Sequence, residues 1–178
     1  MYEIFADLHI HIGRAENGKP IKITGARSLN FANIAKECYE RKGIQVAGII
    51  DCASPYVIED IENFLKTGEA YEIKDGGIIY KDKVCILLGS EVETSEKGRN
   101  GKSGSAHNVC FFPYLKDIKG FSNELAKHVK NVTLSTQRSD LSGYDLVDIV
   151  EKYNGIVIPA HIFTPHKSYY GNWTDRLK

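Results

Sequence analysis

The sequence predicts an α/β fold built on a mainly parallel sheet. Short apolar segments typical of buried strands alternate along the chain with amphipathic segments typical of helices. Residues that often bind metals follow several of these strands: His9 and His11, Asp51, Glu91, and His161. Barrel enzymes gather their chemistry at the carboxyl ends of the strands, so this recurrence favours a β/α barrel. An open doubly wound sheet is the alternative.

The first half of the chain supplies two strands and two helices. We expect strands at 2–9 and 44–50 and amphipathic helices at 28–42 and 56–66. Ser28 is a suitable N-cap for the first helix, and Gly43 is a suitable stop. The run before Asp51 is apolar on both faces, as in a buried parallel strand.

The second half continues the alternation. We expect a hairpin at 70–80, strands at 84–88, 107–112 and 155–159, and helices at 117–130 and 143–154. The hairpin is indicated by Asp75-Gly76-Gly77 between two alternating segments. Residues 94–106 are rich in Gly, Ser and Lys, which predicts a flexible loop, either a surface excursion or a mobile flap.

Composition narrows the class of protein. A chain of 178 residues with 42% apolar and 26% charged residues suits one globular domain. Its 23 basic and 23 acidic residues cancel, so any contact with nucleic acid needs a local basic patch. No membrane span or signal peptide is evident, and four scattered cysteines without a C-x-x-C pair indicate free thiols, which together predict a cytoplasmic protein. The sequence does not define an oligomeric state.

The segment Asp7-Leu8-His9-Ile10-His11 is the most informative one. On a strand, alternate side chains share a face, so Asp7, His9 and His11 would lie together at the strand's carboxyl end. A divalent cation would bind such a group directly. The alternative is a half-exposed strand whose polar residues face water.

Four further residues indicate a metal site only when they are taken together: Asp51, Glu91, His107 and His161. Singly, Asp51 could be a turn residue, and His107 a core histidine. A buried carboxylate such as Glu91 is costly unless it is paired or bound to metal. Imidazoles and carboxylates together suit Zn²⁺, Mn²⁺ or Fe²⁺, and Glu91 could bridge two ions for phosphoester hydrolysis.

Other polar residues are weaker candidates. His128 lies on a polar helix face and is expected to be solvated. His166, on a loop near His161, is a candidate for substrate contact. The loop cations Lys97, Arg99 and Lys102 would suit phosphate groups, or they are plain surface residues.

These motifs resemble the PHP (polymerase and histidinol phosphatase) family. DLHIH at 7–11 matches its first motif, Asp51 its second, Glu91 its bridging glutamate, His107 its third-motif histidine, and His161 its A-H motif. Cys52 stands where the family's second motif carries histidine. The resemblance implies a distorted (β/α)7 barrel with a trinuclear metal site, and a PHP-type metal-dependent phosphoesterase domain over residues 1–178.

Within that family, the chain resembles endonuclease Q-like proteins. Pro159-Ala160-His161-Ile162-Phe163-Thr164-Pro165, Ser168-Tyr169-Tyr170-Gly171 and Glu91-Val92-Glu93 carry the likeness, with His166 where tryptophan is usual. The resemblance implies a DNA repair endonuclease that cleaves 5′ of deaminated bases or at abasic sites.

The resemblance also implies roles for single residues and two or three metal ions, of which zinc is favoured over manganese or iron. His9, His11 and Glu91 would hold one ion, and Glu91, His107 and His161 a second. Asp51 would help with a third, and Asp7 would orient the histidines. Glu91 and Asp51 are the candidate catalytic residues.

The chain departs from the family in one respect. No D-x-H motif follows residue 11, whereas family members carry one on their last strands. We therefore expect a barrel that is incomplete at its C-terminus and an isolated chain that binds metal weakly and has little activity. The alternatives are a small-molecule phosphatase of the histidinol-phosphate type and a truncated, non-catalytic binding module.

Overall fold

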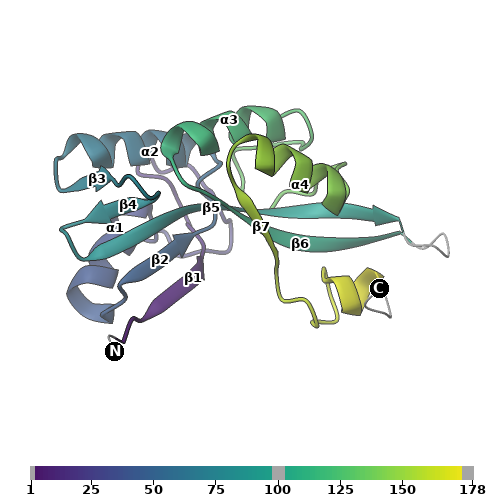
Figure 1. Cartoon of the computed structure of the whole chain (residues 1–178), viewed down its shortest axis with the longest axis horizontal. Coiled ribbons are helices and arrows are strands. Elements are labelled where there is room, and N and C mark those ends of the chain that lie inside the picture. Colours follow the sequence, from purple (N-terminus) through teal and green to yellow (C-terminus); the bar gives the residue numbers. More distant parts are fainter. Residues whose placement is uncertain (1–2, 98–102, 174–178) are drawn as a thin grey trace.

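The chain forms a seven-stranded sheet flanked by helices in the computed structural model, which describes residues 3–97 and 103–173 (Figure 1). The strands are β1 (Ala6–Ile10), β2 (Val46–Ile49), β3 (Ala70–Glu72), β4 (Ile78–Tyr80), β5 (Val84–Lys97), β6 (Ser103–Phe112) and β7 (Ile156–Pro159). The α-helices are α1 (Phe31–Glu37), α2 (Pro55–Lys66), α3 (Leu115–Leu125) and α4 (Gly143–Lys152). Two π-helical turns are η1 (Cys38–Lys42) and η2 (Tyr169–Trp173).

The α/β class is confirmed, but the expectation of a mainly parallel sheet is wrong. Only β1, β2 and β5 pair in parallel, in the order β1-β2-β5. The pairs β3–β4, β4–β5, β5–β6 and β6–β7 are antiparallel. Short connections allow only antiparallel pairing, as in the predicted hairpin, where Gly76 and Gly77 both adopt positive φ angles (+94° and +96°).

The sheet is open within the described residues. Neither β1 nor β7 pairs on its outer side with any strand in residues 3–97 and 103–173. A closed barrel is therefore not seen in this part of the chain. An open sheet is what an incomplete barrel would leave, and the seven-stranded barrel topology stays a prediction.

The segment 94–106 is not a loop over its described length. β5 continues to Lys97 and β6 begins at Ser103, and the two strands form ten consecutive cross-strand pairs from Leu88↔Phe112 to Lys97↔Ser103. The low strand propensity of Gly, Ser and Lys is outweighed because Thr94 and Glu96 are buried within this ribbon. Arg99 and Lys102 lie outside the described residues.

Three helices, α2, α3 and α4, lie along one side of the sheet, and the chain after β7 lies on the other (Figure 1). The predicted helix at 28–42 starts later than expected, because Asn30 rather than Ser28 caps it, accepting a hydrogen bond from the Asn33 backbone N–H (2.8 Å). It passes into η1 and ends, as predicted, at Gly43 in the left-handed conformation. The predicted helix at 117–130 ends at Leu125.

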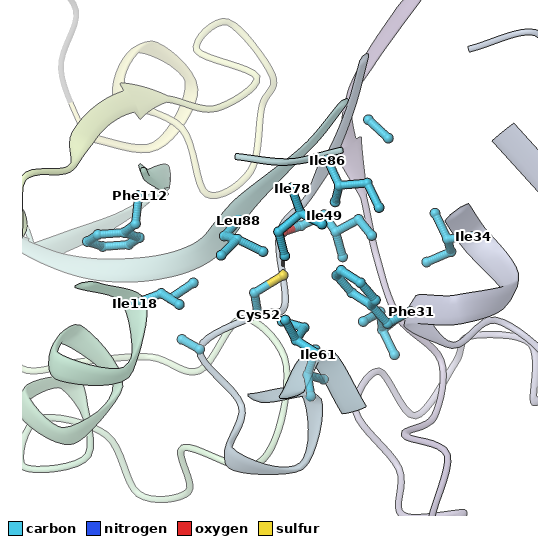
Figure 2. Close-up of a cluster of buried hydrophobic side chains, with 14 of the residues drawn as sticks. Phe31, Ile34, Ile49, Cys52, Ile61, Ile78, Ile86, Leu88, Phe112 and Ile118 are labelled. Carbon is cyan, nitrogen blue, oxygen red and sulfur yellow. Dashed lines mark hydrogen bonds between the residues drawn. The ribbon is translucent and has the colours of Figure 1, made fainter. Parts of the chain in front are cut away.

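The core between the sheet and these helices holds Cys52, the residue that replaces the family's histidine. Figure 2 shows it within a cluster of buried apolar side chains that also holds Ile49 and Ile61. Its thiol donates a hydrogen bond to the Ile49 carbonyl (3.1 Å), and burial raises its pKa far above the ordinary value. Cys52 therefore packs as an apolar residue.

All four cysteines are free, as expected. Within the described residues, no helix combines the length and the apolar character needed to cross a bilayer.

Asp60 on α2 should give this fold a measurable pH dependence. It is buried, its carboxylate accepts a hydrogen bond from the Glu16 backbone N–H (2.9 Å), and burial raises its pKa to about 6. The folded protein holds this proton more tightly than the unfolded chain, so the contribution of Asp60 to stability becomes more favourable as the pH falls from above 6 toward 4.

The substitution Asp60→Asn keeps an acceptor oxygen and removes the charge. We expect it to exceed the parent in stability by about 1–2 kcal/mol at pH 8 and to match it near pH 4.5. Thermal unfolding at both pH values tests this, and a difference independent of pH would contradict it.

Candidate metal centre

The end of β1 is shaped by a β-bulge that places two histidines. Asp7 pairs with Ala47 and Ile10 with Ile49, so β1 has one residue more than β2 between these two pairs. The imidazoles of His9 and His11 meet edge to face, with ring centroids 5.3 Å apart. The extra residue breaks the predicted alternation for Asp7, whose carboxylate accepts a hydrogen bond from the His9 backbone N–H (3.1 Å). Asp7 thus acts on the backbone of His9 and has no described contact with either imidazole.

Four imidazoles, from β1, β6 and the turn after β7, converge on Glu91 in the middle of β5. The nitrogens nearest its Oε1 are His107 Nδ1 at 3.2 Å, His9 Nε2 at 3.4 Å and His161 Nε2 at 3.6 Å. The Nε2 of His11 lies 3.6 Å from Oε2. The five residues that the sequence singled out as ligands of two ions therefore come together. They form two groups, His9–His11–Glu91 and Glu91–His107–His161, each with ligand atoms within 4.8 Å of one another.

The environment of Glu91 fits a cation. Burial alone would raise its pKa, but His107, the Thr136 hydroxyl and His9 together outweigh burial and lower the pKa to about 2, so the carboxylate is ionised at neutral pH. Its side chain is only 3% exposed, yet Oε1 accepts no hydrogen bond within the described residues. An ionised oxygen left this way is costly unless a positive charge meets it. Ligands of a tetrahedral zinc ion lie about 3.4 Å apart, close to the nitrogen–oxygen separations found here.

In three of the four imidazoles, the ring nitrogen that does not face Glu91 contacts another side chain. Asp51 lies 3.1 Å from His11 Nδ1, Glu93 Oε2 lies 3.4 Å from His107 Nε2, and Thr164 Oγ1 lies 3.2 Å from His161 Nδ1. Such partners orient metal-binding histidines and fix their tautomers. The other ring nitrogens of these imidazoles face Glu91, where His107 Nδ1 and His161 Nε2 also lie 3.2 Å from each other, a spacing that suits two ligands of one ion.

Asp51 lies on the far side of the His11 imidazole from Glu91. It is buried, and its Oδ2 accepts a hydrogen bond from the Ile12 backbone N–H at 2.7 Å, besides its contact with His11. It belongs to neither group of candidate ligands. Asp51 is therefore placed to orient His11, and its role with a third ion stays a prediction.

The loop between α3 and α4 supplies contacts that the sequence did not reveal. Thr136 Oγ1 donates a hydrogen bond to Glu91 Oε2 (2.8 Å), and Ser135 Oγ lies 3.3 Å from His11 Nδ1. Thr136 adopts a left-handed backbone (φ +49°), as does His161 (φ +30°), conformations that cost free energy and often occur at functional sites. Hydroxyl residues in a polar loop carry no local signal of this role.

The side chains of the remaining candidates do not contact the cluster within the described residues. Lys97 and His166 are exposed, and neither has a described contact with its residues. His128, expected to be solvated, is half-buried and lies 2.8 Å from Asp140 through its Nδ1. Its helix ends earlier than predicted, which brings it onto the loop after α3.

Glu93 offers a test of the cluster through a residue outside it. Burial raises its pKa, but the Lys167 ammonium at 2.7 Å outweighs burial, and the pKa is lowered overall. Glu93→Gln removes the charge behind His107 while keeping the side chain's shape. We expect zinc affinity to fall about 10–100-fold, the range typical of such partners, with the fold intact. Calorimetric titration with Zn²⁺ measures this, with Lys167→Gln as a milder companion, and an unchanged affinity would refute the role of Glu93.

The fold and the cluster together define an α/β protein with a candidate dinuclear metal centre. No family model matches the chain. It is 47% identical over 171 residues to the uncharacterized protein YqxK of Bacillus subtilis, covering 96% of this chain and 43% of that protein. It is 27% identical over 161 residues to the uncharacterized protein MJ0043 of Methanocaldococcus jannaschii, covering 89% of this chain and 16% of that protein. The chain thus spans less than half the length of these relatives.

Two solved structures share the fold. One is endonuclease Q in complex with a 27-mer duplex that carries an abasic lesion at the active site, with a TM-score of 0.69 and 24% identity over 93% of this chain. The other is the lesion-specific endonuclease PfuEndoQ from Pyrococcus furiosus, with a TM-score of 0.70 and 23% identity over 94% of this chain. In each case the match covers 36% of the other protein. At this identity the likeness establishes the fold.

Proposed function

We propose that residues 1–178 form the PHP-type, metal-dependent phosphoesterase domain of an endonuclease Q-like DNA repair nuclease, which cleaves DNA 5′ of deaminated bases or at abasic sites. The observation that carries the proposal is Glu91 Oε1, a buried, ionised oxygen that faces three imidazole nitrogens and accepts no hydrogen bond from residues 3–97 and 103–173. The fold shared with a nuclease that binds an abasic duplex supports the choice of substrate.

The candidate ligands divide into two halves that share Glu91. His9 and His11 would hold one ion with it, and His107 and His161 the other. Four imidazoles and one carboxylate suit zinc, with manganese or iron as alternatives. Bound ions of this kind supply Lewis acidity toward a phosphoryl oxygen and lower the pKa of a coordinated water.

The protein's own part is to position these groups and to open the site on one side. Glu91 forms a buried floor, while the side chains of His9 and His161 are 42% and 33% exposed. The phosphodiester approaches from that exposed side. Asp51 and Glu93 keep the imidazoles of His11 and His107 turned toward the floor, so little rearrangement is needed when substrate binds.

Duplex DNA with a single lesion tests the proposal. The chain, in excess over DNA and supplied with Zn²⁺ or Mn²⁺, is mixed with duplexes carrying an abasic site, uracil, hypoxanthine or no lesion, and with a phosphomonoester. We expect a nick on the 5′ side of the lesion, none in the intact duplex, and none with Glu91→Gln. Hydrolysis of the phosphomonoester alone would indicate a small-molecule phosphatase. A chain that takes up no metal would indicate a non-catalytic binding module, and either result would overturn the proposal.

A further inference from the structure

A basic groove lies beside the candidate metal centre and has no part in it. It encloses about 520 Å³ between the end of α3, the loop before α4 and β5. Its lining includes Lys127, His128, Lys130, Arg138 and Asp140. The chain as a whole has no net charge, so this gathering of cations is local.

Two of these cations face each other without a counter-charge. Val129 and Ser139 form an antiparallel bridge, a register that sets Lys130 opposite Arg138. The same register sets His128 opposite Asp140, and those two side chains do meet, at 2.8 Å. Within the described residues, no carboxylate lies within ion-pair distance of Lys130 or Arg138. Like charges directly opposite one another destabilise a strand pair, so the arrangement gains nothing for the fold by itself.

The groove is connected to the candidate centre by the chain. Arg138 follows Thr136, which donates to Glu91, by two residues, and its Nε lies 3.4 Å from Ser95 Oγ on β5. That contact uses one edge of the guanidinium, and the outer edge has donors left to face a phosphate. From Glu91 to Ser95 is four residues of strand, about 13 Å. The rise of about 3.4 Å per nucleotide is measured along the axis of B-form DNA, and each strand winds around that axis, so this distance spans only a few phosphates of one strand.

We infer that Lys130 and Arg138 bind the phosphate backbone of the DNA strand a few nucleotides from the bond that is cut. The inference rests on the proposed function for its position along the DNA, but backbone binding itself needs neither a metal nor a lesion. The groove would supply the local basic patch that a neutral chain requires in order to hold DNA.

Binding to an intact duplex of 30 base pairs, in the presence of EDTA, tests the groove apart from cleavage. Fluorescence anisotropy between 50 and 200 mM salt gives affinity and its salt dependence. For Lys130→Gln/Arg138→Gln we expect about tenfold weaker binding and a slope of log K against log salt that is smaller by about 1.8, or 0.9 for each lost phosphate contact. The melting temperature should be equal or higher, since a repulsion is removed.

The matched control is Lys36→Gln/Arg41→Gln, which removes two exposed cations from α1 and η1. It should bind DNA like the parent. Equal losses in both double variants, or no change in affinity and slope for the groove variant, would overturn the inference. So would poly-glutamate binding as tightly as DNA. If the parent chain fails to cleave DNA with a lesion, but the groove variant still binds intact DNA more weakly than the parent, the proposed function is wrong and the groove inference stands.

Discussion

Glu91→Gln is expected to abolish stable metal binding. Glu91 belongs to both groups of candidate ligands, so its loss weakens two sites at once. We expect an affinity loss on the order of 1,000-fold, beyond the 10–100-fold typical of residues that act through a ligand. At 100 times its dissociation constant, a metal that binds only the folded protein stabilises it by about 2.7 kcal/mol, or roughly 5–10 °C for a chain of this size. That metal-dependent rise in melting temperature should disappear in Glu91→Gln.

Glu96→Gln is the matched control for this experiment. Glu96 is buried on the same strand, five residues further along, and accepts hydrogen bonds from the Thr94 hydroxyl (2.7 Å) and the Gly143 backbone N–H (3.0 Å). It belongs to neither group of candidate ligands. The same change of carboxylate to amide should leave the metal response intact there. If the two variants respond to metal alike, Glu91 is not the shared ligand.

Gly48→Ala should damage the fold and the centre together. A Cβ at Gly48 would lie 2.8 Å from both Cα and O of Leu8, which are backbone atoms that no side-chain rotation can clear. Either β1 or β2 must move, and His9 follows Leu8 directly. We expect a destabilisation of about 2–3 kcal/mol, at the upper end for overpacking, together with a weaker metal response.

Gly68→Ala separates crowding from the general cost of replacing a glycine. Gly68 has φ +78° and open space around its Cα, so alanine there should cost about 1 kcal/mol through backbone strain alone. Its metal affinity should equal that of the parent. Denaturant unfolding and zinc titration of both variants make the comparison, and a Gly48→Ala protein no less stable than Gly68→Ala would contradict the close approach of β1 to β2.

The elements that the sequence predicted best are those whose signal is local. Hydrophobic periodicity located α2 within a residue, and Asp75-Gly76-Gly77 located the hairpin between β3 and β4. The β5–β6 ribbon was missed because its strand ends are stabilised by partners distant in sequence. Ser95, for example, donates through its backbone N–H to the Leu141 carbonyl at 2.8 Å. Composition alone does not report such burial.

The residues of the candidate site also fall into those that a local sequence signal predicted and those that it did not. His9, His11, Glu91, His107 and His161 stand at strand ends or within strands, where residue type and position already indicated their convergence. The β-bulge that separates Asp7 from them lies where Leu8 approaches Gly48 closely, and such a tertiary contact leaves no local signal in the sequence. Thr136 was invisible for a similar reason, since its contact with Glu91 spans 45 residues of chain.

A crystal of the chain grown with Zn²⁺ would test the metal centre most directly, through the anomalous scattering of zinc. We predict two peaks, one about 2.0–2.2 Å from ligand atoms of His9, His11 and Glu91 and the other at similar distances from ligand atoms of Glu91, His107 and His161. Zinc bound only at other residues, or a structure in which these five side chains stand too far apart to share ions, would contradict the account.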